Sequence, residues 1–153
     1  MIDSHKYIPK AYIAGPLYNE GERWILEQVD NFCKGVGFET YLPHRDGGLC
    51  PSSGEGGEYF FIEDKKKLEE SDLVVAILNG SSIDSGTAWE LGYAYSRGCN
   101  LLGYFDDTRI AIPKANINLM IYYSVDLCST WDELKEKLQA IFFGFTKKEE
   151  KNE

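Results

Sequence analysis

Histidine and closely spaced cysteines are scarce in this 153-residue chain, which disfavours the kinds of catalytic and metal sites that depend on them. There are two histidines, His5 and His44, so few residues are available for a Ser-His-Asp mechanism or a zinc site. The four cysteines form no CxxC pair and lie far apart in the sequence, at Cys33, Cys50, Cys99 and Cys128. We therefore expect reduced thiols, no metal, no cofactor and no redox centre.

Positive charge and long apolar runs are also lacking. Sixteen basic residues face twenty-five acidic ones, which gives a formal net charge of −9. Such a surface disfavours nucleic-acid backbones and anionic membranes, but not a single nucleoside bound in a pocket. No apolar stretch is long enough to cross a bilayer, and none near the N-terminus resembles a signal peptide, so we expect a cytoplasmic protein.

Short apolar runs alternate with segments of helical periodicity. The expected strands are 10–14, 38–42, 73–78, 100–105 and 124–127. Helical spacing covers 20–36, 58–70, the segment from 87 to 98, and 130–143, with a helical turn within 116–123. Strands alternating with helices predict an α/β fold with a doubly wound sheet of about five parallel strands and helices on both faces.

The 43% hydrophobic share and the length suit one domain with a proper core. We divide the chain into a loose leader at 1–9, a single domain at 10–145 and a charged, disordered tail at 146–153. Residues 43–57 have no periodicity and five glycines, which predicts a long loop.

The stretch from residue 71 to 98 carries three carboxylates, Asp72, Asp84 and Glu90. In a doubly wound sheet, ligands bind at the carboxyl ends of the strands, so the loops 15–19, 43–57 and 79–86 are expected to share one rim. Asp84 and Glu90 are six residues apart, about 240° around a helix, and converge only if Asp84 lies in the loop and Glu90 in the helix.

Two such carboxyl groups can divide the work of a retaining glycosidic-bond enzyme without a metal or a histidine. An ionised carboxylate near a helix N-terminus can attack carbon as a nucleophile. A second, partly desolvated carboxyl group can hold a proton and pass it to the leaving group.

Each candidate also has a structural explanation. Thr87 and Glu90 fit a capping box, and Asp84 in a Ser/Gly loop fits a helix N-cap. Asp72, directly before a strand, fits a turn, and Tyr12, within a strand, fits a core aromatic. Spacing alone leaves these alternatives open.

Four segments together resemble the nucleoside 2-deoxyribosyltransferase family, in order and with comparable spacing from about residue 10 to 143. They are Tyr12-Ile-Ala-Gly-Pro16, Ser71-Asp72-Leu-Val-Val-Ala76, Asp84-Ser-Gly-Thr-Ala-Trp-Glu90-Leu-Gly-Tyr-Ala94 and Ile117-Asn118-Leu119-Met120. The resemblance implies a flavodoxin-like fold, a role in nucleotide salvage, and transfer of 2-deoxyribose between purine or pyrimidine bases through a covalent enzyme intermediate.

The same resemblance implies roles for individual residues. Glu90 is the nucleophile, Asp84 transfers a proton to the base, Asp72 binds the base and assists proton transfer, and Tyr12 orients Glu90. The residues expected to contact substrate are Gly15, Pro16, Gly86 and Asn118. Asn118 is similar to a residue that reaches a neighbouring subunit's pocket, which implies a homo-oligomer.

Two other functions compete with the transferase. A related enzyme would hydrolyse 2-deoxynucleoside 5-monophosphates with water as the acceptor, but the loop at 15–19 has no positive charge for a phosphate, which then needs Arg23, Arg45 or backbone amides. A non-catalytic nucleotide-binding module could use the same fold. The three acids and Tyr12 argue against it, because a binding module needs no nucleophile.

Overall fold

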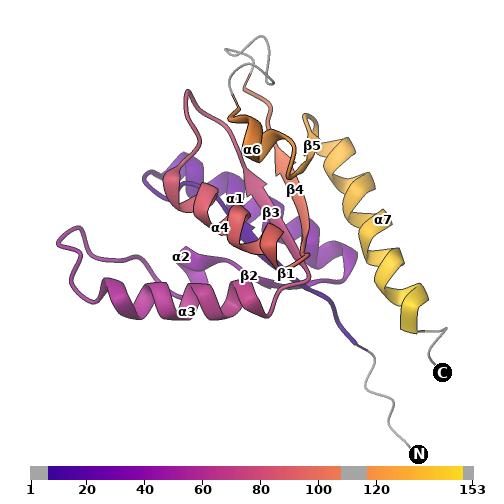
Figure 1. The fold of residues 1–153 in the computed structure, drawn as a ribbon, viewed down its shortest axis with the longest axis horizontal. Coiled ribbons are helices and arrows are strands. Elements are labelled where there is room, and N and C mark those ends of the chain that lie inside the picture. The colour runs from indigo at the N-terminus through magenta and orange to yellow at the C-terminus, as the bar shows by residue number, and fades with distance from the viewer. Residues whose placement is uncertain (1–6, 108–116, 150–153) are drawn as a thin grey trace, which may run out of the picture.

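A computed structural model describes residues 7–107 and 117–149, and Figure 1 shows their arrangement. The centre is a five-stranded sheet in the order β2-β1-β3-β4-β5, in which every neighbouring pair is parallel. The predicted α/β sheet is confirmed. The strands are β1 (Lys10–Ala14), β2 (Glu39–Tyr41), β3 (Leu73–Ile77), β4 (Asn100–Tyr104) and β5 (Asp126–Cys128).

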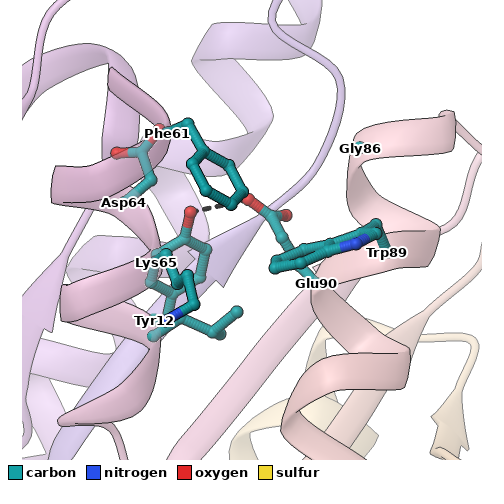
Figure 2. A pocket seen from close by; sticks show the side chains of 8 residues that line it. Tyr12, Phe61, Asp64, Lys65, Gly86, Trp89 and Glu90 are labelled. Carbon is teal, nitrogen blue, oxygen red and sulfur yellow. Dashed lines mark hydrogen bonds between the residues drawn. The ribbon is translucent and has the colours of Figure 1, made fainter. Parts of the chain in front are cut away.

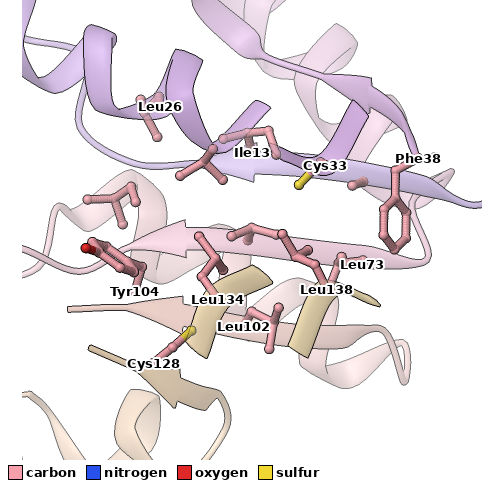
Figure 3. Packing of buried hydrophobic residues seen from close by; sticks show 14 of the residues in the cluster. Ile13, Leu26, Cys33, Phe38, Leu73, Leu102, Tyr104, Cys128, Leu134 and Leu138 are labelled. Carbon is pink, nitrogen blue, oxygen red and sulfur yellow. The ribbon is translucent and has the colours of Figure 1, made fainter. Parts of the chain in front are cut away.

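Helices cover both faces of this sheet. They are α1 (Glu20–Val36), α2 (Pro43–Asp46), α3 (Gly57–Glu69), α4 (Ser85–Ser96), α6 (Leu119–Tyr122) and α7 (Trp131–Glu149). One face packs against α1 and α7, with Leu26, Cys33, Leu134 and Leu138 at its centre (Figure 3). The other face packs against α3, α4 and α6 through Leu68, Leu91 and Ile121.

The strand β3 lies at the middle of the sheet, and all five of its residues are buried. Side chains of a strand alternate between the two faces, so Leu73, Val75 and Ile77 join one core while Val74 and Ala76 join the other. This explains why β3 reads as a continuous apolar run and not as an alternating one.

The largest differences between the structure and the sequence prediction are at two segments. Residues 43–57 are not an uninterrupted loop, because α2 begins at Pro43, a residue suited to the first turn of a helix. The last helix does not end at 143 but continues to Glu149, where a disordered tail was expected from 146. Phe142 and Phe145 pack against the core beside α1, which stabilises this extension. Residues 150–153 lie outside the described part.

The described part of the leader, residues 7–9, has no helix or strand but is tied to the sheet. Tyr7 Oη donates to Asp72, and the Pro9 carbonyl accepts from the Glu39 amide. Within the described ranges, no helix has the length and apolar character needed to cross a membrane.

Candidate active site

The side chain of Glu90 points from α4 toward β1. Tyr12 Oη donates a hydrogen bond to Glu90 Oε1 at 2.6 Å, and the Tyr12 side chain is fully buried in the sheet (Figure 2). The helix α4 begins at Ser85, with Asp84 and not Thr87 as its N-cap, so Glu90 lies beyond the first turn. The capping-box explanation of Glu90 therefore does not hold, and its carboxylate faces a phenol.

Burial governs the protonation of this pair. It raises the pKa of Glu90 to about 7, the Tyr12 hydrogen bond opposes the rise, and the charges of Asp64 and Asp84 add to it. Burial and the neighbouring Glu90 carboxylate raise the pKa of Tyr12 far above its usual range. Tyr12 consequently remains a hydrogen-bond donor, while Glu90 changes protonation near neutral pH.

A second acid, Asp64 on α3, lies near Glu90 and was not predicted from the sequence. Tyr41 Oη, at the end of β2, donates to Asp64 Oδ1 at 2.8 Å. Burial raises the pKa of Asp64 and the Tyr41 hydrogen bond lowers it, with the raised direction prevailing. One signal was available: Asp64 lies one helical turn before the buried Leu68, which places both residues on the inward face of α3.

A cavity of about 320 Å³ opens between α3 and α4. Glu90, Tyr12 and Asp64 supply most of its reactive groups, while Phe61 and Trp89 form an aromatic wall with ring centroids 5.7 Å apart. An apolar cavity of this size with a few polar groups fits a small organic ligand. The lining residues are Tyr12, Phe61, Asp64, Lys65, Leu68, Gly86, Trp89 and Glu90.

Asp84 lies at the rim and is the N-cap of α4, as its structural explanation predicted. Its Oδ2 accepts from the Thr87 amide at 2.9 Å, and its Oδ1 accepts from Tyr18 Oη at 2.7 Å. Although burial raises the pKa of Asp84, these donors lower it below its usual value. An acid held ionised in this way is suited to accepting hydrogen bonds and poorly suited to donating a proton.

Asp72 is not brought to the cavity. It precedes β3 and lies at the amino edge of the sheet, where its Oδ2 accepts from the Lys10 amide at 2.8 Å and from Tyr7 Oη at 2.6 Å. In a parallel sheet this edge lies opposite the carboxyl ends that carry the rim loops. Asp72 is therefore absent from the cavity lining, whereas Asp64 is part of it.

The other expected contact residues divide between packing and the cavity. A Cβ at Gly15 would lie 2.7 Å from Leu26 Cδ2, so this glycine allows α1 to approach the end of β1. Gly15 and Pro16 lie outside the cavity lining, whereas Gly86 is part of it. Asn118 is exposed and caps α6, its Oδ1 accepting from the Met120 amide at 2.9 Å.

Arg45 and Arg23, the two arginines considered for a phosphate, have internal partners. Arg45 Nη1 lies 2.6 Å from Asp30 Oδ2, and its other nitrogens bind Asp46. Arg23 Nη1 donates to the Leu17 carbonyl at 2.7 Å. Across the described ranges, no group of three or more histidine, cysteine, aspartate and glutamate side chains is arranged to hold a metal.

Solved structures with a similar fold come from several organisms. A conserved protein from Enterococcus faecalis V583 is 23% identical, with a TM-score of 0.74 over 88% of this chain and 99% of its own. A 2-deoxyribosyltransferase from Bacillus psychrosaccharolyticus is 26% identical, with a TM-score of 0.70 over 82% of this chain and 90% of its own. A CMP N-glycosidase from Clostridium botulinum shares the fold at 16% identity and a TM-score of 0.53, over 86% of this chain and 97% of its own.

No curated protein sequence matches the chain significantly. The sequence model of the family described as nucleoside 2-deoxyribosyltransferase matches residues 11–139, most of the chain and all of the described cavity. This protein therefore belongs to the nucleoside 2-deoxyribosyltransferase family.

Proposed function

We propose that this protein transfers 2-deoxyribose between purine or pyrimidine bases through a covalent ester on Glu90. The observation that carries the proposal is the pairing of Glu90 with Tyr12 inside a cavity that also holds Asp64. A phenol donor orients one carboxylate oxygen, while a second acid of raised pKa lies close enough to influence the first. One acid that attacks and a second that carries a proton suit a retaining exchange at an anomeric carbon.

In the first half of the reaction, a Glu90 carboxylate oxygen bonds to the anomeric carbon as the bond from that carbon to the base nitrogen breaks. The departing base keeps the electron pair of the broken bond and takes a proton from Asp64. In the second half, the nitrogen of an incoming base attacks the same carbon, and the ester to Glu90 breaks. Asp64, now ionised, accepts the proton that the incoming base loses.

The scheme requires that Asp64 carries a proton while Glu90 is ionised. Two neighbouring acids in a desolvated site share protons, so their titration belongs to the pair. When Asp64 holds the proton, its charge no longer raises the pKa of Glu90, and the nucleophile ionises more easily. The substrate-ready state is therefore an ionised Glu90 beside a protonated Asp64.

Asp84 has a different task in this scheme. Its lowered pKa and its position at the first turn of α4 suit it to accept a hydrogen bond from a sugar hydroxyl. Tyr18 occupies Oδ1 of Asp84 from the loop after β1, and a bound sugar would compete with this phenol. The absence of a 2-hydroxyl in the substrate favours the reaction, because the oxocarbenium-like transition state is then less costly.

The second candidate is hydrolysis of a 2-deoxynucleoside 5-monophosphate. One observation favours it: Lys65 lines the cavity and could face a phosphate, although its ammonium already lies 2.6 Å from Glu69 Oε1. The internal partners of Arg23 and Arg45 argue for an uncharged nucleoside. We therefore place the transferase first.

The experiment supplies deoxyinosine and adenine in one incubation and a deoxynucleoside monophosphate in another, and follows the products by chromatography. Deoxyadenosine in the first supports the transferase, and free base from the monophosphate alone favours the hydrolase. With neither product, a non-catalytic binding module would be the better description. Intact-mass measurement after a deoxynucleoside is added without an acceptor should show one added deoxyribosyl group, which Glu90→Ala should not acquire.

The proposal includes a homo-oligomer in which Asn118 lies near a neighbouring subunit's cavity. An apolar groove of about 460 Å³ runs between α4 and α6, and Met120 in it is 82% exposed. Because Asn118 begins α6, a second copy seated in this groove would lie close to Asn118. Met120→Glu should yield monomers in sedimentation velocity, while Phe143→Glu, which changes an exposed residue of α7, should not. Monomeric wild-type protein would contradict the proposed oligomer.

A further inference from the structure

We propose that Tyr41 is a positioning residue for this reaction, whose hydroxyl holds Asp64 beside Glu90 and favours the carboxylate that receives the proton of the incoming base. The inference rests on the proposed function of Asp64 and adds to it a residue that touches neither the sugar nor the base. Three observations support it. Tyr12 and Tyr41 are paired in the sheet, Gly47 packs closely against the Tyr41 hydroxyl, and burial and the Tyr41 hydrogen bond have opposite effects on the pKa of Asp64.

The register of β1 and β2 makes Tyr12 and Tyr41 direct neighbours. Their Cα atoms are paired in the ladder, so both side chains project from the same face of the sheet, and their ring centroids are 5.6 Å apart. Each phenol donates to a carboxylate from a different helix, Tyr12 to Glu90 on α4 and Tyr41 to Asp64 on α3. Adjacent positions in the sheet thereby hold the two acids side by side.

The chain after α2 packs tightly over the Tyr41–Asp64 hydrogen bond. A Cβ at Gly47 would lie 2.5 Å from Tyr41 Oη and 3.3 Å from Asp64 Oδ1. The φ angle of Gly47 is −94°, which other residues adopt readily, so space and not backbone conformation requires glycine here. The Lys67 ammonium lies 6.0 Å from the centre of the Tyr41 ring. Tyr41 is thus fixed by its surroundings with its hydroxyl directed at Asp64.

Asp64 needs access to both protonation states in one cycle, because it gives a proton to the leaving base and takes one from the entering base. Burial and, to a smaller extent, the charge of Glu63 raise the pKa of Asp64 and favour the protonated state that gives a proton, whereas the Tyr41 hydrogen bond lowers this pKa and favours the ionised state that takes one. Removal of the Tyr41 hydroxyl should therefore leave the rate of base departure unchanged or increase it, and should slow the addition of the incoming base. A residue with only a structural role would slow both halves together.

The first test is Tyr41→Phe, which keeps the ring and removes the hydroxyl. Base release in a single turnover and transfer from the loaded enzyme to a new base are each followed across pH. We expect the alkaline limb of base release to move up by about one pH unit, and transfer at neutral pH to fall about tenfold. Equal slowing of both halves with an unshifted pH profile would overturn the proposal.

Two further variants control for packing. Tyr104→Phe removes the hydroxyl of another tyrosine–aspartate pair, in which Tyr104 Oη donates to Asp106 Oδ2 at 2.9 Å at the end of β4. It should retain the wild-type pH profile. Gly47→Ala keeps both Tyr41 and Asp64 but pushes them apart, and it should shift the profile in the same direction as Tyr41→Phe. A wild-type profile for Gly47→Ala would count against the proposal.

A titration without substrate separates this inference from the proposed function. The carboxyl carbon of Asp64 is followed by NMR against pH in wild type and Tyr41→Phe, with the resonance assigned from Asp64→Asn. A higher midpoint in Tyr41→Phe supports control of Asp64 by Tyr41 even if no deoxyribosyl transfer is found, in which case the proposed function alone fails. An unchanged midpoint overturns the role of Tyr41 whatever the activity.

Discussion

A buried carboxylate lies against one face of the sheet and two partly buried carboxylates lie against the other, and they differ in the charge of their partners. On the α1 side, Asp30 is 2% exposed and accepts from Arg45 at 2.6 Å and from Lys34 at 2.8 Å. Burial raises its pKa, but Arg45, Lys34 and Thr40 lower it below the usual value. On the α3 and α4 side, Glu90 and Asp64 accept from tyrosines, and the pKa of each is raised.

One fold thus lowers the pKa of one acid and raises the pKa of another through the choice of hydrogen-bond partner. A cationic partner stabilises only the ionised form of a buried carboxylate, so Asp30 acts as a fixed charge that ties α2 to α1. A phenol donates one hydrogen bond without a compensating charge, so the desolvation of Glu90 remains partly unopposed. The second arrangement raises the pKa of both acids and brings that of Glu90 to about 7, as is common for groups at functional sites.

The strongest test of this comparison removes the proposed nucleophile. Glu90→Gln keeps the size of the side chain and cannot form the ester, so deoxyribosyl transfer should fall on the order of 10⁴-fold. Steady-state transfer rates and circular dichroism measure this loss in a protein that stays folded. Activity within tenfold of wild type would remove Glu90 from the role of nucleophile.

The next test compares two aspartates to which sequence and structure give different roles. Asp64→Asn should slow transfer roughly 10²–10³-fold, because the leaving base loses its proton donor. Asp72→Asn should keep nearly wild-type rates, because Asp72 binds Lys10 and Tyr7 at the opposite edge of the sheet. Both variants are assayed with deoxyinosine and adenine. A large loss in Asp72→Asn with little loss in Asp64→Asn would reverse the assignment.

A third test concerns the fixed charge. Asp30→Asn leaves Arg45 and Lys34 without their shared carboxylate and should lower the free energy of unfolding by about 2 kcal/mol, roughly 4–8 °C in Tm. The contribution of Asp30 is present above its unfolded pKa and is lost as pH falls through the lower folded value, so the difference should shrink in acid. Asp126→Asn, which removes an exposed pair with Lys137, should leave Tm nearly unchanged.

The smallest expected effect has the opposite sign. The folded pKa of Glu90, about 7, lies above its usual 4.5, so its contribution to stability is full below 4.5 and is lost as pH rises through 7. Glu90→Gln does not titrate and should become more stable than wild type by about 1–2 kcal/mol between pH 5 and pH 8. Urea unfolding at several pH values measures this crossover. If the free energies of unfolding of wild type and Glu90→Gln changed in parallel with pH, ionisation of Glu90 would not destabilise the folded protein.

The sequence predicted the sheet because its central strands carry strong local signals, such as the uninterrupted apolar run of β3. It also predicted Glu90 and Tyr12 as partners through the family resemblance, and their hydrogen bond agrees with that expectation. Asp72 lies within the segment 71–76 that resembles the family, but a match in sequence does not show that a residue at the amino edge of the sheet reaches the cavity.

Asp64 could not be singled out in the same way, because it lies within the charged run of α3, Glu63-Asp64-Lys65-Lys66-Lys67. Its hydrogen-bond partner Tyr41 lies on β2, 23 residues away along the chain. Likewise, α2 is four residues long and is held by ion pairs between Arg45, Asp30 and Asp46, interactions that hydrophobic periodicity does not reveal. Pairwise tertiary contacts therefore account for what local patterns missed.

The pairing of Tyr12 with Tyr41 has a consequence for engineering the cavity of this protein. A strand cannot slip by one residue without turning its side chains to the opposite face, so the two phenols keep their spacing as long as the sheet exists. Phe61 and Trp89 instead project from helices and are about half exposed at the cavity mouth. Libraries that vary only these two aromatic positions would reshape the cavity wall, while the phenols that bind Glu90 and Asp64 remain anchored in the backbone ladder.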